Sequence, residues 1–177
     1  MMILALNGSP RKGGNTDLLI DQIFTGARKK GHICQKIYLY ESKISPCVDC
    51  RHCKQGDFHC PIKDDMPQLM ALMTKADTLL FGTPIYWYGP TAKMKLLIDR
   101  LRPLIATKGL AGKKGVIIVP SEEGASICGS IVKMFEMSFH YLGMVNRGAF
   151  LTTAYEKGEI SQNSGEMQRA LKFGYRL

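Results

Sequence analysis

The stretch LNGSPRKGGNT (residues 6–16) decides the fold of this 177-residue chain. It follows a short apolar run and leads into a segment whose apolar residues recur at helical spacing. The turn is crowded with glycines, basic side chains, hydroxyls and asparagines, although a connection between a strand and a helix needs far less. This composition predicts a loop that holds an anion. Glycines let the backbone approach a ligand, and a helix N-terminus presents free N–H groups.

Strand and helix patterns alternate along the rest of the chain. We expect strands at 3–6, 32–40, 78–82, 115–120 and 144–152. We expect helices from Asn15, as the capping residue, to Gly31, after Asp64 and Asp65, from Gly89 through Leu101, and from Ile127 to Gly143, with a short basic amphipathic tail. The pattern predicts one α/β domain over 1–177. Its five-stranded parallel sheet is doubly wound in the order 2-1-3-4-5, with helices on both faces.

Composition and charge narrow the class of protein. Hydrophobic residues make up 45% of the chain and charged residues 22%, which is typical of a globular domain. No apolar run is long enough to span a bilayer, and the N-terminus lacks a basic leader, so we expect a cytoplasmic protein without a membrane anchor. The net charge of +9 comes from scattered residues. This pattern fits a solvated surface or attraction to phosphate-bearing cofactors, and disfavours a nucleic-acid footprint.

In a doubly wound sheet, ligands bind beyond the carboxyl ends of the strands. In the first such loop, Ser9, Asn15 and Thr16 can donate hydrogen bonds, and Arg11 offers a fork that matches a phosphate. Gly14 lets the backbone turn. The signatures of nucleoside-triphosphatase loops and of dinucleotide-binding turns are absent. The loop therefore predicts a phosphate-monoester site, with an ordinary glycine-rich turn as the alternative.

The loops after the third and fourth expected strands are also unusual. TPIYWYGP (83–90) carries three successive aromatic residues, which cannot all face inward and offer stacking surfaces for a flat ring. In PSEEGAS (120–126), Ser121 and Gly124 are candidates for the rim of the site, and a plain surface turn is equally compatible. A phosphate loop beside an aromatic loop predicts FMN as the ligand.

These segments together resemble the flavodoxin-like NADPH-dependent FMN reductases, and within them the iron–sulfur flavoprotein group. The resemblance covers roughly residues 1–150. It runs through the first loop, the cysteine cluster, PIKDDM (61–66) and FGTPIYWYGPTAKMKLLIDR (81–100). It implies that Ser9, Arg11, Asn15 and Thr16 contact the FMN phosphate, and that the ring lies against Pro84, Ile85, Tyr86 and Trp87. It also implies a homodimer or homotetramer with the flavin near a subunit interface.

Four of the six cysteines fall in the irregular stretch 41–64, an insertion that follows the second expected strand. Cys47, Cys50, Cys53 and Cys60 have the spacing C-x2-C-x2-C-x6-C. Four thiolates in one compact loop suit a [4Fe–4S] cluster, and members of the resembled group carry one near the flavin. The alternatives are a zinc site, with His52 or His59 as substitute ligands, and a metal-free or oxidised loop. The other two, Cys34 and Cys128, are expected to be buried small hydrophobes.

The expected function is electron transfer through FMN, with the cluster relaying electrons to or from it. NAD(P)H or a reduced ferredoxin is the candidate electron donor. No hydrolytic triad or acid–base pair stands out, so we assign no catalytic side chain. One alternative is a cluster-free NAD(P)H-dependent FMN or quinone reductase. Another is a redox-sensing binding module, whose cysteine loop changes affinity for a partner.

Overall fold

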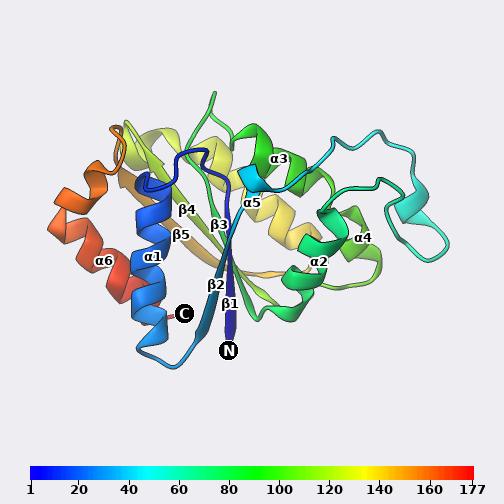
Figure 1. The fold of residues 1–177 in the computed structure, drawn as a ribbon, viewed down its shortest axis with the longest axis horizontal. Helices are drawn as coiled ribbons and strands as arrows, with labels where there is room; N and C mark the ends of the chain where they lie inside the picture. The colour runs from blue at the N-terminus through cyan, green and yellow to red at the C-terminus, as the bar shows by residue number, and fades with distance from the viewer.

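The computed structural model describes residues 1–177 and contains a five-stranded parallel sheet in the order β2-β1-β3-β4-β5 (Figure 1). The strands are β1 (Met2–Asn7), β2 (Ile33–Tyr38), β3 (Thr78–Gly82), β4 (Lys114–Ser121) and β5 (Val145–Thr153). All four pairings between neighbours are parallel. The expected sheet and strand order are confirmed, and each strand end differs from its expected position by at most two residues.

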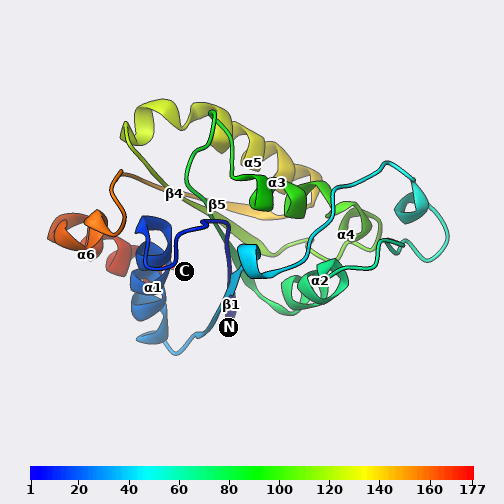
Figure 2. The ribbon, with the colours of Figure 1, turned by 45° about the horizontal axis from the view of Figure 1, so that its top comes forward.

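Helices cover both faces of the sheet (Figures 1 and 2). One face carries α1 (Asn15–Arg28) and α6 (Ser164–Gly174), and the other carries α2 (Met66–Lys75), α3 (Ala92–Asp99), α4 (Arg102–Ala106) and α5 (Gly129–Tyr141). Helices α1 and α6 approach closely, because a Cβ atom at Gly26 would lie 2.1 Å from the carbonyl oxygen of Leu171. The C-terminal amphipathic segment is thus an integral part of this layer.

The core is split by the sheet into two clusters. Alternate residues of β1 face opposite sides: Leu4 and Leu6 pack in the larger cluster with α2 to α5, and Ile3 and Ala5 pack in the smaller one with α1 and α6. Such burial on both faces explains why the central strands are nearly continuous apolar runs. Phe81 anchors the larger cluster, where it meets two phenylalanines of α5.

Several helix boundaries differ from expectation. The helix expected to continue through Leu101 ends at Asp99, and α4 begins at Arg102, because Pro103 cannot continue the earlier helix and suits the first turn of a new one. Helix α5 starts at Gly129 after a separate 3₁₀ turn over Gly124–Ile127.

The cap of α1 also differs from expectation. Gly14 occupies the capping position of α1, and Asn15 is already helical and makes no capping hydrogen bond. Its side chain is used elsewhere, as described below.

The segment between β2 and α2 contains only two 3₁₀ turns, Leu39–Glu41 and His52–Lys54. Figures 1 and 2 show it projecting beyond α2 and α4. Of the remaining cysteines, Cys128 is buried as expected, whereas Cys34 is only partly buried, because its strand lies at the edge of the sheet. No helix has the length and apolar character needed to cross a membrane.

Candidate functional site

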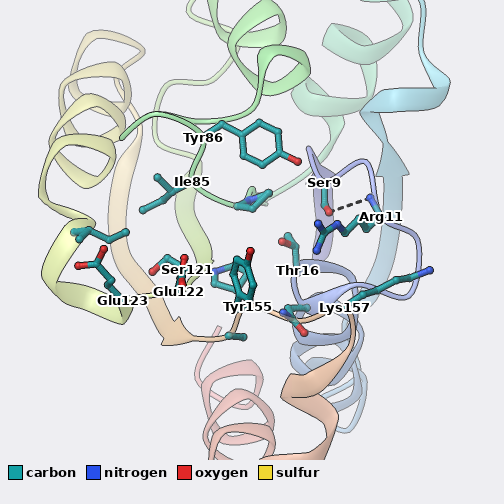
Figure 3. A pocket seen from close by; sticks show the side chains of 15 residues that line it. Ser9, Arg11, Thr16, Ile85, Tyr86, Ser121, Glu122, Glu123, Tyr155 and Lys157 are labelled. Carbon is teal, nitrogen blue, oxygen red and sulfur yellow. Dashed lines mark hydrogen bonds between the residues drawn. The ribbon is translucent and has the colours of Figure 1, made fainter.

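A pocket lies at the carboxyl edge of the sheet, where the loops after β1, β3, β4 and β5 meet (Figure 3). Its lining comprises Ser9, Arg11, Asn15, Thr16, Pro84, Ile85, Tyr86, Pro120, Ser121, Glu122, Glu123, Ile127, Ala154, Tyr155 and Lys157. Eight of these were among the candidate residues from the sequence. Three further candidates, Gly14, Trp87 and Gly124, lie in the same loops but outside the lining.

The first loop is held tightly against its surroundings. The Gly8 N–H donates to the Gly82 carbonyl at 2.7 Å, and the Thr91 hydroxyl donates to the Gly8 carbonyl at 2.6 Å. Gly13 has a φ of +67°, a conformation that favours glycine. At Gly14, a Cβ atom would lie 2.8 Å from the Arg11 carbonyl oxygen. The glycines of this loop are therefore required by its shape.

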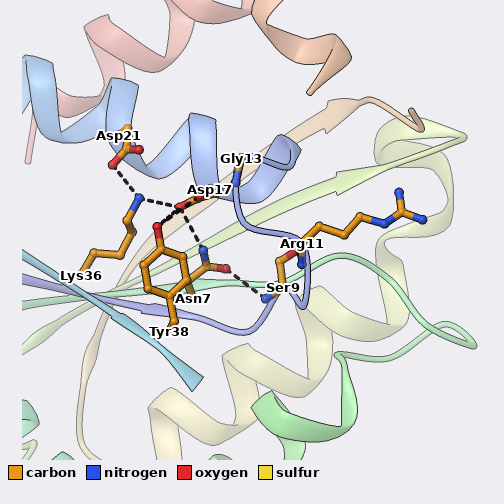
Figure 4. A network of polar contacts seen from close by, with 8 residues as sticks. All are labelled: Asn7, Ser9, Arg11, Gly13, Asp17, Asp21, Lys36 and Tyr38. Atoms are coloured by element: carbon orange, nitrogen blue, oxygen red, sulfur yellow. Dashed lines mark hydrogen bonds and ion pairs between the residues drawn. The ribbon is translucent and has the colours of Figure 1, made fainter. Parts of the chain in front are cut away.

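Asp17, at the first turn of α1, organises a polar network beneath the loop (Figure 4). Its carboxylate accepts the Gly13 N–H at 2.7 Å and the Asn7 amide at 3.2 Å. Two side chains of β2 approach from the other side, since the Lys36 ammonium and the Tyr38 hydroxyl both donate to Asp17. The loop thus keeps its shape through buried contacts within the protein.

The charges of this network are mutually stabilising. The Asp17 side chain is 6% exposed and that of Lys36 is 13% exposed. Burial acts to raise the pKa of Asp17, but the hydrogen bonds from Lys36, Gly13 and Tyr38 outweigh it and hold this pKa below its usual value. Burial likewise opposes the charge of Lys36, and the hydrogen bonds to Asp17 and Asp21 raise its pKa overall. Both groups are therefore charged at neutral pH.

The loop leaves several donors free. The Ser9 N–H donates to the Asn7 side chain, and the Arg11 N–H donates to the Ser9 hydroxyl oxygen. No hydrogen bond within the protein uses the backbone N–H groups of Lys12, Asn15 or Thr16. The positive end of the α1 dipole lies at Asn15 and Thr16, so the free N–H groups of these two residues form an anion-binding corner that borders the pocket.

Asn15 connects two loops of the site. Its amide donates to the Glu156 carbonyl at 2.8 Å and its side-chain oxygen accepts the Ile160 N–H at 3.2 Å. The side chain thereby fixes the segment after β5, which contributes Ala154, Tyr155 and Lys157 to the pocket. The backbone N–H of Asn15 and the second hydrogen of its side-chain amide are left for a ligand, which refines the role expected for this residue.

The loop after β3 forms the opposite wall. The Thr83 hydroxyl oxygen accepts the Thr91 N–H at 3.1 Å, which closes the two ends of the loop. Tyr86 and Gly89 pair through two backbone hydrogen bonds, so the tip is a tight hairpin. Tyr86 borders the pocket in Figure 3, whereas Trp87 at the tip is 96% exposed. This wall therefore offers Pro84, Ile85 and Tyr86 as a surface for a flat ring.

The loops after β4 and β5 complete the pocket. Gly124 has a φ of +66°, and a Cβ atom there would lie 2.4 Å from the Thr153 hydroxyl, so this turn requires glycine. Tyr155 and Lys157 also line the pocket, although neither was expected from the sequence. The rule that ligands bind beyond the carboxyl ends of strands could have indicated these two residues, because it applies equally to TAYEKG (153–158) after β5.

Charge is distributed unevenly around the pocket. Arg11 and Lys157 lie on the side of the first loop, whereas Glu122 and Glu123 lie on the side of the loop after β4 (Figure 3). Lys12 is directed away to the surface, where it pairs with Glu41. An anionic group is thus favoured at one end of the pocket only.

The cysteine-rich loop, residues 46–63, projects beyond α2 and α4 and contributes no residue to the pocket lining (Figures 1 and 2). Cys47 and Cys50 are exposed, whereas Cys53 and Cys60 are partly buried, and all four thiols are free. Burial and the neighbouring Cys60 raise the pKa of the Cys53 thiol, so these side chains lie near one another. No three His, Cys, Asp or Glu side chains converge as they would around a bound metal ion.

A family model decides the relationship of this chain to known proteins. Residues 1–156 match the NADPH-dependent FMN reductase family. The chain belongs to this family. In this FMN reductase family member, every pocket residue lies within the matched segment except Lys157, which follows it directly.

Curated relatives fall into two groups. An iron–sulfur flavoprotein of Methanocaldococcus jannaschii is 36% identical over 115 residues, which cover 65% of this chain and 59% of that protein. An iron–sulfur flavoprotein of Archaeoglobus fulgidus is 40% identical over 102 residues, which cover 49% of that protein. A putative NAD(P)H-dependent FMN-containing oxidoreductase of Bacillus subtilis is 30% identical over 178 residues, which cover 96% of this chain and 94% of that protein.

Solved structures agree on the fold. The Trp repressor binding protein of Bacillus subtilis superposes with a TM-score of 0.69 and 23% identity, over 100% of this chain and 98% of that chain. An FMN-dependent NADH-azoreductase of Bacillus anthracis, solved with FMN, gives a TM-score of 0.70 and 13% identity over 99% of each chain. The flavodoxin-like fold expected from the sequence is confirmed.

Proposed function

We propose that this family member is an FMN-dependent oxidoreductase whose pocket holds FMN with its phosphate at the first loop. One observation carries the proposal. The unpaired N–H groups of Asn15 and Thr16 at the start of α1 and a wall made of Pro84, Ile85 and Tyr86 lie in one pocket, with basic residues at the phosphate end only. These are the two kinds of surface that a flavin mononucleotide needs.

The side chains of the pocket bind and orient the cofactor. Bound FMN supplies one-electron and two-electron chemistry. The N–H groups of Asn15 and Thr16 hold the phosphate, and Arg11 and Lys157 add positive charge at the rim. The wall formed by residues 84–86 positions the ring. We assign no proton transfer to any side chain.

NAD(P)H is the proposed electron donor. The family description names NADPH, and the Bacillus subtilis relative that matches most of this chain is described as NAD(P)H-dependent. A ferredoxin is the second candidate donor, since iron–sulfur clusters exchange single electrons. The two are separated by steady-state turnover with NADH, NADPH and a reduced ferredoxin, each with the same acceptor.

We further propose that Cys47, Cys50, Cys53 and Cys60 hold a [4Fe–4S] cluster that exchanges electrons with FMN. The donor set fits, because all four are free thiols within 14 residues of one another in a loop without regular structure. Asp49, Arg51 and Phe58, which lie between the four cysteines, have positive φ angles, so the backbone of this loop is turned rather than extended at these residues. The names of several relatives also support a cluster.

A cluster-free flavin reductase is the second candidate. One observation favours it: the relative matched over 94% of its length is described as a putative NAD(P)H-dependent FMN-containing oxidoreductase. The chain spans about half to three-fifths of the two iron–sulfur flavoproteins above.

A single preparation tests these possibilities. The protein is purified without oxygen, and its visible spectrum is recorded together with iron, acid-labile sulfide and flavin analysis. About four irons per chain, with flavin bands over a broad absorbance that dithionite bleaches, support the cluster-containing enzyme. Flavin without iron supports the second candidate. No flavin after addition of FMN contradicts both.

We also propose a homodimer or homotetramer with the flavin near the interface. Trp87, Tyr88 and Tyr155 are exposed around the mouth of the pocket, and Met137 and Tyr141 are exposed on α5. Exposed aromatic residues of this kind are enriched at protein interfaces. Size-exclusion chromatography with light scattering gives the mass of the assembly, and a Trp87→Ser variant is expected to shift it toward the monomer.

A further inference from the structure

The cysteine-rich loop is closed at its base by a small set of hydrogen bonds. The Asp65 N–H donates to the Lys43 carbonyl at 3.0 Å, and the Lys43 N–H donates to the Asp65 carboxylate at 2.7 Å. The Ser45 N–H donates to the Asp64 carboxylate at 2.9 Å. The two segments that enter and leave the loop, residues 43–45 and 64–65, are therefore paired. We call this pairing the stem, and residues 46–63 form the loop beyond it.

Arg100, at the end of α3, lies directly beneath the stem. Its guanidinium donates to the Ser45 carbonyl at 2.7 Å and to the Asp64 carboxylate at 2.8 and 3.3 Å. The Arg100 side chain is 1% exposed and that of Asp64 is 3% exposed. One buried cation thus contacts both sides of the loop base.

The guanidinium has one donor left over. Its Nε–H is buried and has no hydrogen-bond partner. Burial acts to lower the pKa of Arg100, but Asp64 and the nearby Cys60 side chain raise it overall. Arg102, two residues further along the chain, lies close enough to influence Cys53 in the same way. The corner between α3 and α4 therefore presents positive charge to two of the four cysteines.

The buried Arg100–Asp64 pair, with its unpaired Nε–H, lowers the stability of the fold unless that donor serves a ligand. A buried ion pair contributes little net stability compared with apolar residues of similar size, and a buried donor without a partner is destabilising. Hydrogen bonds and charges near thiolate ligands, however, set the reduction potential of an iron–sulfur cluster. A cation favours the more negative, reduced state of a cluster, and so raises its reduction potential.

We propose that Arg100 is a positioning residue for the cofactor of the cysteine-rich loop: it fixes the loop base through Ser45 and Asp64, and directs its free Nε–H toward the sulfur of Cys60. This inference rests on the proposed [4Fe–4S] cluster. It assigns Arg100 a role in tuning the potential as well as in holding the loop.

The test compares three variants with the wild type, all prepared without oxygen. Arg100→Gln removes the positive charge and keeps a polar group at the stem. Arg100→Lys keeps the charge and removes the Nε–H and the fork. Lys95→Gln is the matched control, because it removes a positive charge from the same helix at an exposed position paired with Asp99. Reduction potentials are measured by titration with spectroscopic detection, alongside iron content and limited proteolysis.

We expect Arg100→Gln to have a more negative potential, by at least a tenfold change in the one-electron equilibrium constant, or about 59 mV. Arg100→Lys is expected to shift in the same direction by less, and Lys95→Gln to match the wild type. If Arg100→Gln loses its iron, Arg100→Lys provides the test: a shifted potential supports the proposal and an unshifted one overturns it. Unchanged potentials in both Arg100 variants also overturn it.

A failure of the proposed function is distinguishable from a failure of this inference. If the wild type binds no iron, the cluster proposal fails, and the tuning role of Arg100 fails with it. The stem is then judged by proteolysis of the metal-free protein. Faster cleavage within residues 46–63 in the Arg100 variants, but not in Lys95→Gln, supports the stem, and equal cleavage in all variants overturns it.

Discussion

The first loop and the cysteine-rich loop are both binding loops, but they are built in opposite ways. The first loop is short and is held by buried partners on three strands: Asn7, Gly82 and the β2 side chains that reach Asp17. Within residues 46–63, the side-chain hydrogen bonds are local and exposed, such as those from Arg51 to Asp49 and from His59 to Asp57. One loop has its binding shape before a ligand arrives. The other is fixed only at its stem.

This difference predicts different responses to ligand removal. A loop that is organised by the protein binds its ligand at a low entropic cost, whereas a loop that is ordered by its ligand loses structure without it. Hydrogen exchange is expected to be slow at the hydrogen-bonded amides of the first loop, those of Gly8, Ser9 and Gly13, with or without FMN. In residues 46–63 it is expected to slow only when a cluster is present.

The largest effect is expected from the cysteines. Cys53→Ser removes a thiolate ligand of the proposed cluster, so we expect complete loss of iron with retention of FMN. Iron and flavin are measured on the same sample. Cys34→Ser, at a partly buried position of β2, is the matched control and is expected to keep both cofactors. Equal iron contents in the two variants contradict the assignment of the ligands.

The second effect concerns the network beneath the first loop. Asp17→Asn removes the charge that Lys36 pairs with, and weakens the contact to the Gly13 N–H. We expect a loss of about 2 kcal/mol in the free energy of unfolding and about thirtyfold weaker FMN binding. Urea unfolding and a flavin fluorescence titration measure the two quantities. Asp21→Asn is the control, since Asp21 is exposed and contacts the same Lys36 without touching the loop.

The same carboxylate predicts a pH dependence. The pKa of Asp17 is lower in the folded protein than its ordinary value of 3.8. Its contribution to stability is therefore complete above pH 3.8 and declines as the pH falls through the lowered pKa. The stability difference between wild type and Asp17→Asn is expected to be constant near neutral pH and to shrink in acid. A difference that grows in acid contradicts the assignment of the charged state.

How well the sequence predicts each loop depends on whether the residues that contact the loop are near it in the chain or distant in sequence. The first loop carries its own signal, because its glycines and hydroxyls are adjacent in the chain, and eight candidate residues line the pocket. Asp17 looks like an ordinary first-turn carboxylate until β2 places Lys36 and Tyr38 beside it. Likewise, Arg100 is an unremarkable helical arginine in sequence, and only the tertiary fold buries it beneath residues 45 and 64. Sequence periodicity predicts elements, whereas long-range polar contacts require the register of the sheet.

A moderate effect is expected at Thr16, where the hydroxyl and the fold make separable contributions. Its methyl group packs near Gly82, so Thr16→Val preserves the packing and removes only the hydroxyl. A hydrogen bond to a charged phosphate is worth about 1.5 kcal/mol, so we expect FMN affinity to fall about tenfold with little change in unfolding temperature. Thr25→Val, on an exposed turn of the same helix, is the control for the substitution itself. Equal affinities in the two variants exclude a contact between the Thr16 hydroxyl and the phosphate.

The smallest effect is expected at Lys157, on the rim of the pocket. It distinguishes attraction by overall positive charge from binding by the fixed donors at the start of α1. Lys157 lines the pocket but is exposed, so salt screens its attraction to a phosphate. Lys157→Gln is expected to weaken FMN binding by about threefold at low ionic strength and to have almost no effect at 0.5 M salt, where the Debye length is about 4 Å. The loss in Thr16→Val, by contrast, persists in salt because a direct hydrogen bond does not depend on a distant field. If salt abolishes both losses alike, the first loop attracts its ligand by charge alone, and the distinction between an organised and an unorganised loop does not hold.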